Sequence, residues 1–141
     1  MDDPYDLERF VNAQNADGIY ERALGELRRG HKTSHWMWFV FPQIAGLGQS
    51  AMSRRFAISS LEEAKRYLRH DVLGPRLLEC ADVVAQTATG SAERILGAVD
   101  AQKLRSSMTL FLRSAPDESL FGRVLDVYFD GLPDAATDQL I

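Results

Sequence analysis

Residues 31–50 of this 141-residue chain are HKTSHWMWFVFPQIAGLGQS, its densest aromatic stretch. They contain both tryptophans, two of the seven phenylalanines and two of the three histidines, and they include a glycine-rich turn. Aromatic side chains gathered in this way form a hydrophobic core or line a pocket. Polar groups among them need hydrogen-bond partners or a ligand. The stretch therefore predicts a part of the core with a candidate site beside it.

On either side of this stretch, apolar residues recur with helical spacing. Capping residues, glycines and prolines mark the ends of seven expected helices, which cover about residues 7–14, 19–29, 60–68, 74–87, 91–97, 100–114 and 119–129. His35–Phe41 adds a short helix that Pro42 ends. Residues 44–55 are expected to form a loop, and only Phe56–Ser59 could be a brief strand. The pattern predicts one compact, mainly α domain over residues 1–141, with about seven helices and little or no strand.

Composition excludes several classes of protein. The net charge of −4 gives no general basis for binding nucleic acid, and no apolar run approaches the ~20 residues of a membrane-spanning helix. The acidic N-terminus lacks the apolar region of a signal peptide, and the single cysteine, Cys80, fits a buried thiol in a reducing cytoplasm. His31 and His35 have no third ligand nearby, so we expect no metal site. No cofactor is expected either.

Residues 100–114, DAQKLRSSMTLFLRS, place polar side chains inside an apolar arc. The apolar residues, which span about 200° of the helix at 100° per residue, are Leu104, Met108, Leu110, Phe111 and Leu112. Asp100, Lys103 and Ser107 fall within that arc. Asp100 is expected to be the N-cap, whereas lysine is rarely buried unless it is paired. Lys103 therefore predicts a structural ion pair or an anion-binding pocket, with Ser107 on the same face.

The aromatic stretch allows two interpretations. Trp36, Trp38 and Phe41 are either core side chains or a platform on which a planar ring stacks. In the second case Gln43 would bind a polar edge of that ring, and His35 would serve as acid, base or phosphate donor.

The turn at Gly46 and Gly48 lacks the preceding strand and the third glycine of a dinucleotide-binding fingerprint. Its backbone could still hold an anion, with Ser50 and Arg54 nearby.

Five stretches of the chain resemble a widespread bacterial family, a domain of unknown function often labelled calpastatin. They are SHWMWFVFPQIAGLGQS, LEEAKRYL, LGPRLLEC, KLRSSMTLF and VLDVYFDGLPDAAT, which together cover almost the whole chain. The resemblance implies a mainly helical single domain and carries no established activity. Calpastatin inhibitory segments are disordered, whereas this composition can bury a core, so we reject that function.

A second similarity is to the helical NADAR group, which processes ADP-ribose-type and related N-glycosidic compounds. It rests on Gly74, Arg76, Lys103, Met108 and Phe111. The chain departs from that group around the aromatic stretch, where the group's glutamate-containing motif is missing. The similarity agrees with an aromatic platform beside a buried cation.

Two functions follow from these observations. The first is a site for a phosphate-bearing small molecule, nucleotide or ADP-ribose-like, which either binds that molecule or acts on it as an N-glycoside hydrolase. The phosphate would be held by Lys32, Lys103, Arg54 and the glycine turn. A carboxylate is needed for glycosidic cleavage, and the acid and base candidates are His35, Asp100 and Glu21. The alternative is a non-enzymatic protein-interaction or regulatory domain, with the aromatic stretch as core or as a partner surface.

Overall fold

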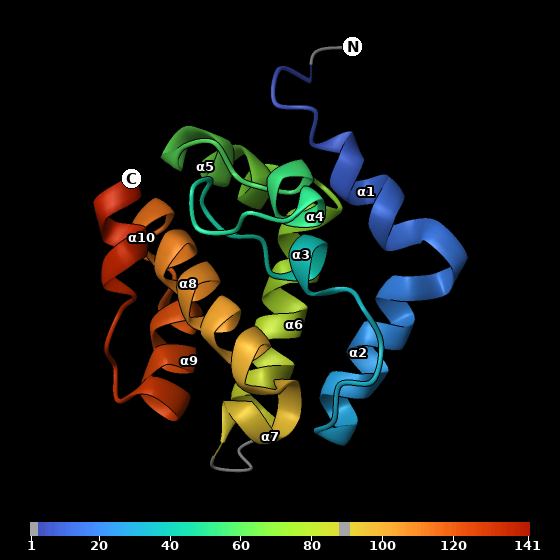
Figure 1. Ribbon diagram of the computed structural model, residues 1–141, viewed down its shortest axis with the longest axis vertical. Coiled ribbons are helices and arrows are strands. Elements are labelled where there is room, and N and C mark those ends of the chain that lie inside the picture. The colour runs from blue at the N-terminus through green and yellow to red at the C-terminus, as the bar shows by residue number, and fades with distance from the viewer. Residues whose placement is uncertain (1–2, 88–90) are drawn as a thin grey trace.

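The computed structural model describes residues 3–87 and 91–141. The expected mainly α fold is confirmed (Figure 1). Its helices are α1 Glu8–Asn15, α2 Ile19–Arg29, α3 Met37–Val40, α4 Ala51–Arg55, α5 Leu61–Arg69, α6 Leu73–Thr87, α7 Ala92–Leu96, α8 Ala98–Ser114, α9 Ser119–Phe129 and α10 Ala135–Leu140, with a 3-10 turn at Ala16–Gly18. The expected bounds of α2 and α9 match the structure.

Helices α6 and α8 form the centre of the fold, and the other helices surround them (Figure 1). Helix α6 packs against α2, α5 and α9, whereas α8 packs against α5, α7, α9 and α10. Close packing at the start of α6 requires a glycine, because a Cβ on Gly74 would lie 2.1 Å from the carbonyl oxygen of Leu68. The α5–α6 corner therefore depends on this residue having no side chain.

A continuous row of aromatic rings joins four helices through the core. Phe10 of α1 contacts Tyr67 of α5, which contacts Phe111 of α8, which contacts Phe121 of α9. The ring centroids of these pairs lie 5.1–5.8 Å apart. All four side chains are fully buried or nearly so. Because aromatic contacts add to the burial of apolar area, this row stabilises the N-terminal and C-terminal helices as one unit.

Two short helices differ from the sequence prediction. Residues 51–55 were expected in a loop but form α4, whose N-cap Ser50 accepts a hydrogen bond from the Ser53 N–H. Residues after Pro133 form α10, whose N-cap Asp134 accepts from the Thr137 N–H. Neither segment has an extended apolar face, so periodicity gave no signal for either, although both N-cap residues are typical ones.

Asp100 is not the N-cap of α8, as the sequence suggested. The helix begins at Ala98 with Gly97 as its N-cap, which places Asp100 within the first turn. Gly97 has φ +86, a conformation that glycine adopts without strain. The Asp100 carboxylate is therefore available to other partners.

At Phe56–Ser59, which the sequence allowed as a brief strand, the structure has an isolated parallel bridge between Ile44 and Ile58. The Ala45 N–H donates to the Ile58 carbonyl and the Ile58 N–H donates to the Gln43 carbonyl, both at 2.8 Å. This bridge fixes the backbone of residues 43–45 against the segment that follows α4.

Candidate functional site

A buried carboxylate on α2 organises the start of the aromatic stretch. Glu26 accepts hydrogen bonds from the N–H groups of Thr33 and Ser34, from the Ser34 hydroxyl and from Trp36 Nε1, at 2.6–2.9 Å. Burial acts to raise the pKa of Glu26, but these bonds to its ionised form outweigh burial and lower the pKa to about 2. The segment between α2 and α3 is therefore held by one anionic side chain.

Sequence reasoning did not single out Glu26. A glutamate in an amphipathic helix is usually solvent-exposed, but this one is 1% exposed. The sequence feature that could have pointed to Glu26 is the segment after α2, where Ser34 and Trp36 carry donors that need an acceptor.

Two lysines share one carboxylate beside this segment. Lys32 Nζ lies 2.9 Å from Asp100 Oδ2, and Lys103 Nζ lies 3.6 Å from Asp100 Oδ1. The lysine side chains are only 10% and 20% exposed, and that of Asp100 is 17% exposed. Across residues 3–87 and 91–141, Asp100 is the single carboxylate within ion-pair distance of either lysine. The cluster therefore carries one excess positive charge in a largely desolvated place.

Each lysine of this cluster also lies over a tryptophan ring. Lys32 Nζ is 5.2 Å from the centroid of Trp36, and Lys103 Nζ is 5.1 Å from the centroid of Trp38. These are favourable cation–π distances. The expected ion pair of Lys103 is present, but Asp100 is shared with Lys32.

The aromatic residues of this stretch differ in accessibility. Trp36 and Phe41 are 0% exposed, so neither offers a free face to a ligand ring. The suggestion that they form a stacking platform is wrong for both, because their rings pack against each other in the core. Trp38 is half-buried and lines a pocket. It is therefore the one member of the expected platform that a ligand could reach.

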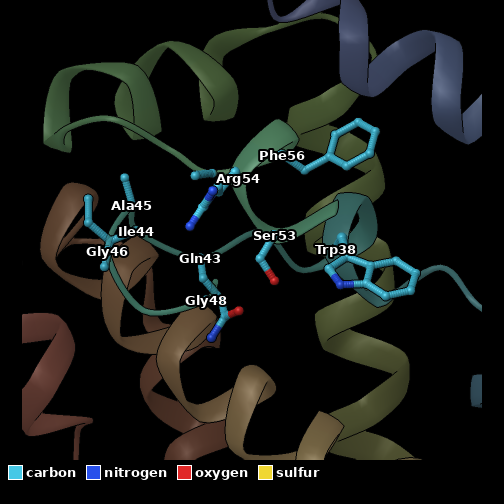
Figure 2. Close-up of a pocket in the computed structure, with 10 residues that line it drawn as sticks. Trp38, Gln43, Ile44, Ala45, Gly46, Gly48, Ser53, Arg54 and Phe56 are labelled. Atoms are coloured by element: carbon cyan, nitrogen blue, oxygen red, sulfur yellow. The ribbon is translucent and has the colours of Figure 1, made fainter. Parts of the chain in front are cut away.

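Two hollows lie on either side of the loop from Gln43 to Gly48, and both residues line each of them. The smaller, here called the Arg54 pocket, has a volume of about 130 Å³ (Figure 2). Its lining includes Trp38, Gln43, Gly46, Gly48, Ser53 and Arg54. The larger, here called the Lys103 groove, has a volume of about 420 Å³, and its lining includes Gln43, Leu47, Gly48, Val99, Lys103 and Asp134.

The two glycines of the loop have separate structural roles. Gly46 has φ +106, which L side chains rarely adopt. Gly48 lies against Ser53, because a Cβ added at Gly48 would come within 2.4 Å of the Ser53 Cβ and Oγ. The glycine turn is thus required by backbone conformation at one position and by close approach at the other.

Ser53 and Arg54, both of α4, line the Arg54 pocket (Figure 2). The Ser50 and Ser53 hydroxyls are hydrogen-bonded to each other at 2.9 Å. Arg54 Nη2 donates to the neutral Gln49 Oε1 at 3.3 Å. Ser50 caps α4 and does not line the pocket itself, but it is hydrogen-bonded to Ser53, which does.

Three predicted site residues are placed elsewhere. Glu21 is exposed in the first turn of α2. It is therefore on a different helix from Asp100 and Lys103, which lie on α8. His35 is exposed beside the buried Trp36 and is not among the residues that line either hollow. Ser107 is fully buried one turn after Lys103, and its hydroxyl has no hydrogen-bond partner among the described residues. The suggested acid–base pairing of His35 or Glu21 with this site has no geometric support.

The carboxylate in the wall of the Lys103 groove is already bound. Asp134 accepts hydrogen bonds from Gln102 Nε2, the Ser106 hydroxyl and both the N–H and hydroxyl of Thr137. Its own N–H donates to Thr109 Oγ1 at 2.8 Å. The residue joins α8 to α10, and its side chain is a structural support for the groove.

The residues that suggested a NADAR-like arrangement do not form one cluster. Met108 and Phe111 are fully buried in the core, and Gly74 packs against the Leu68 carbonyl. Arg76 lies over the Tyr20 ring and donates to Gln14 Oε1 at 3.2 Å. Of the five, Lys103 is the one that lines a hollow described above.

Across the described parts of the chain, no three His, Cys, Asp or Glu side chains are grouped to hold a metal ion. No helix of those parts combines the length and the apolar composition needed to cross a membrane. Burial raises the pKa of the Cys80 thiol to about 12, so this cysteine is a poor nucleophile at neutral pH.

Comparison with known proteins agrees with this fold. A crystal structure of the conserved hypothetical protein Rv1873 from Mycobacterium tuberculosis is 50% identical in sequence, with a TM-score of 0.95. The similarity covers 99% of this chain and 98% of that protein. No curated protein shows a significant match. The family described as protein of unknown function DUF1810 matches residues 4–141, so the chain belongs to that family.

Proposed function

We propose that this protein binds a small phosphate-bearing molecule in the Lys103 groove. The observation that carries the proposal is the pairing of Lys32 and Lys103 with a single carboxylate, Asp100. A largely buried cation without full compensation is destabilising unless an anion accompanies it. A phosphate group in the groove would supply that anion.

Lys103 is the ligand-binding member of the pair. Its distance to Asp100 is 3.6 Å, compared with 2.9 Å for Lys32. Lys103 also lines the groove, whereas Lys32 does not. If Lys103 turns to a ligand, Asp100 keeps its shorter contact with Lys32, so no buried carboxylate is left unpaired.

The shape and lining of the groove suit a molecule that also carries an apolar or planar part. Leu47 and the 71%-exposed Val99 form an apolar wall, and Gln43 offers an amide to a polar edge. The volume of about 420 Å³ lies within the 300–1,000 Å³ typical of small-molecule sites. A nucleotide or an ADP-ribose-like compound meets this description.

Binding, without hydrolysis, is the activity we propose. Cleavage of an N-glycosidic bond needs a carboxylate beside the reacting carbon. The carboxylates of Asp100 and Asp134 already have their partners within the protein.

A thermal-shift titration with Lys103→Gln tests the proposal. The ligands are ADP-ribose, AMP, ATP and inorganic phosphate, and the control is Lys65→Gln, because Lys65 is the remaining lysine and is exposed on α5. A ligand at 100 times its Kd raises stability by about 2.7 kcal/mol. We expect such a shift for wild type and Lys65→Gln, and at least a tenfold weaker Kd for Lys103→Gln.

Two results would contradict the proposal. If no phosphate compound shifts the wild-type melting temperature, the groove is not a phosphate site, and the interaction-domain alternative becomes the working hypothesis. If Lys103→Gln binds as tightly as wild type, Lys103 is only a structural ion-pair partner.

A further inference from the structure

We infer that the ligand carries two anionic groups, one held by Lys103 in the groove and the other by Arg54 in the small pocket. This inference rests on the proposed function, because it assigns a second subsite to the same site. It thereby narrows the ligand class to molecules with two anionic groups, such as diphosphates or phosphates with a second acidic group.

The first argument is that the two hollows have a common wall. Gln43 and Gly48 line both the Arg54 pocket and the Lys103 groove. Trp38 links them further, since it lines the pocket and has Lys103 Nζ 5.1 Å from the centroid of its ring. The Ile44–Ile58 bridge fixes the loop between them. A ligand that crosses this loop reaches one cation on each side.

The second argument is charge. The lining of the groove holds one cation, Lys103, and one carboxylate, Asp134, whose hydrogen-bond partners are neutral. On the pocket side, Arg54 is exposed, and its guanidinium donates to the neutral amide oxygen of Gln49. Arginine offers paired donors that match a phosphate or carboxylate. Two separate positive charges beside one loop favour a ligand with two negative groups.

The third argument is the size and chemistry of the Arg54 pocket. Its volume of about 130 Å³ is below the 300 Å³ at which small-molecule sites begin, so it suits a single small group. The Ser53 hydroxyl and the Arg54 guanidinium both belong to residues that line this hollow (Figure 2). These donors fit a terminal anionic group better than an uncharged ring.

Gly48 is consistent with this arrangement. A Cβ at residue 48 would lie 2.4 Å from Ser53 Oγ. The loop therefore stays close to the serine, and Gly46 and Gly48 border the space in which the terminal group would sit.

Isothermal titration of inorganic phosphate, pyrophosphate and tripolyphosphate into the full chain tests the inference. The variants are Arg54→Gln and Lys103→Gln, and Arg55→Gln is the matched control, since Arg55 is the neighbouring arginine of α4, is exposed and does not line the pocket. We expect wild type and Arg55→Gln to bind the di- or triphosphate at least tenfold more tightly than phosphate. Arg54→Gln should lose that advantage and keep its affinity for phosphate.

The outcomes separate the inference from the proposed function. If Arg54→Gln keeps the full preference for the longer anions, the second subsite is wrong, while a loss of phosphate binding in Lys103→Gln still supports the groove. If neither phosphate nor the longer anions bind wild type, the proposed function fails together with the inference. Circular dichroism of each variant checks that a lost affinity does not reflect unfolding.

Discussion

The two tryptophans, two residues apart, occupy contrasting surroundings. Trp36 is sealed in the core, with its Nε1–H bound to Glu26 and Lys32 over its ring. Trp38 is half-buried, lines a pocket and has Lys103 over its ring. A tryptophan with a lysine over its ring thus stabilises the core at position 36 and is accessible to a ligand at position 38. The bond from Trp36 to Glu26 and the deeper burial of Trp36 set it apart from Trp38.

The largest effect on stability is expected around the buried Trp36. Glu26→Ala removes the acceptor of four hydrogen bonds and leaves their donors unsatisfied inside the protein. Bonds to charged groups contribute about 1.5–3 kcal/mol each and are not additive, so we expect a loss of about 3–5 kcal/mol. Urea unfolding measures it. Glu21→Ala, on the exposed face of the same helix, should change stability by less than about 0.5 kcal/mol; comparable losses in both variants would contradict the assignment.

Low pH should also destabilise the region around Trp36, because it protonates Glu26. Because the pKa of Glu26 is lowered to about 2 in the folded protein from a usual value of 4.5, the unfolded chain binds more protons between these values. Its contribution is therefore present above about pH 5 and is lost as the pH falls toward 2, by up to about 3 kcal/mol. Unfolding free energies of wild type and Glu26→Gln from pH 2 to 7 measure this. Parallel curves for the two proteins would show that another group dominates.

Substituting each tryptophan separately compares the two directly. Trp36→Phe loses the bond to Glu26 within the core, and we expect a loss of about 2 kcal/mol, whereas Trp38→Phe should cost less than about 1 kcal/mol. Iodide quenching reports access. Emission of the remaining Trp38 should be quenched in Trp36→Phe, and that of Trp36 should be protected in Trp38→Phe. Equal quenching in both variants would contradict the contrast.

The smallest effect on stability is expected in the loop that lines the two hollows. Gly48→Ala forces its Cβ against Ser53, for an expected loss of about 1 kcal/mol, and should weaken binding of pyrophosphate at least fivefold by displacing that serine. The control is Gly122→Ala, because a Cβ there meets only Leu112 at 3.9 Å and alanine favours a helix. Unfolding and titration measure both variants. Unchanged pyrophosphate binding in Gly48→Ala would place the terminal anion elsewhere.

The sequence predicted the fold better than the site, for physical reasons. Long amphipathic helices such as α2 and α9 follow from local periodicity, whereas α4 and α10 lack it and depend on contacts from distant segments. Lys103 could be identified because a charged residue interrupts an apolar arc. Lys32 comes close to Lys103 and Asp100 only in the folded chain. The same holds for Glu26 and the groups that donate hydrogen bonds to it. The burial of Trp36 but not Trp38 likewise depends on tertiary packing that no local pattern encodes.

The row of rings from Phe10 through Tyr67 and Phe111 to Phe121 has one more consequence. Lys103 stands on the same helix as Phe111, whereas the Gln43–Gly48 loop is fixed to the segment that precedes α5, which carries Tyr67. A molecule bridging Lys103 and that loop would hold α5 and α8 together from outside the core. Ligand occupancy should therefore slow amide hydrogen exchange along both helices, well away from the residues that touch the ligand.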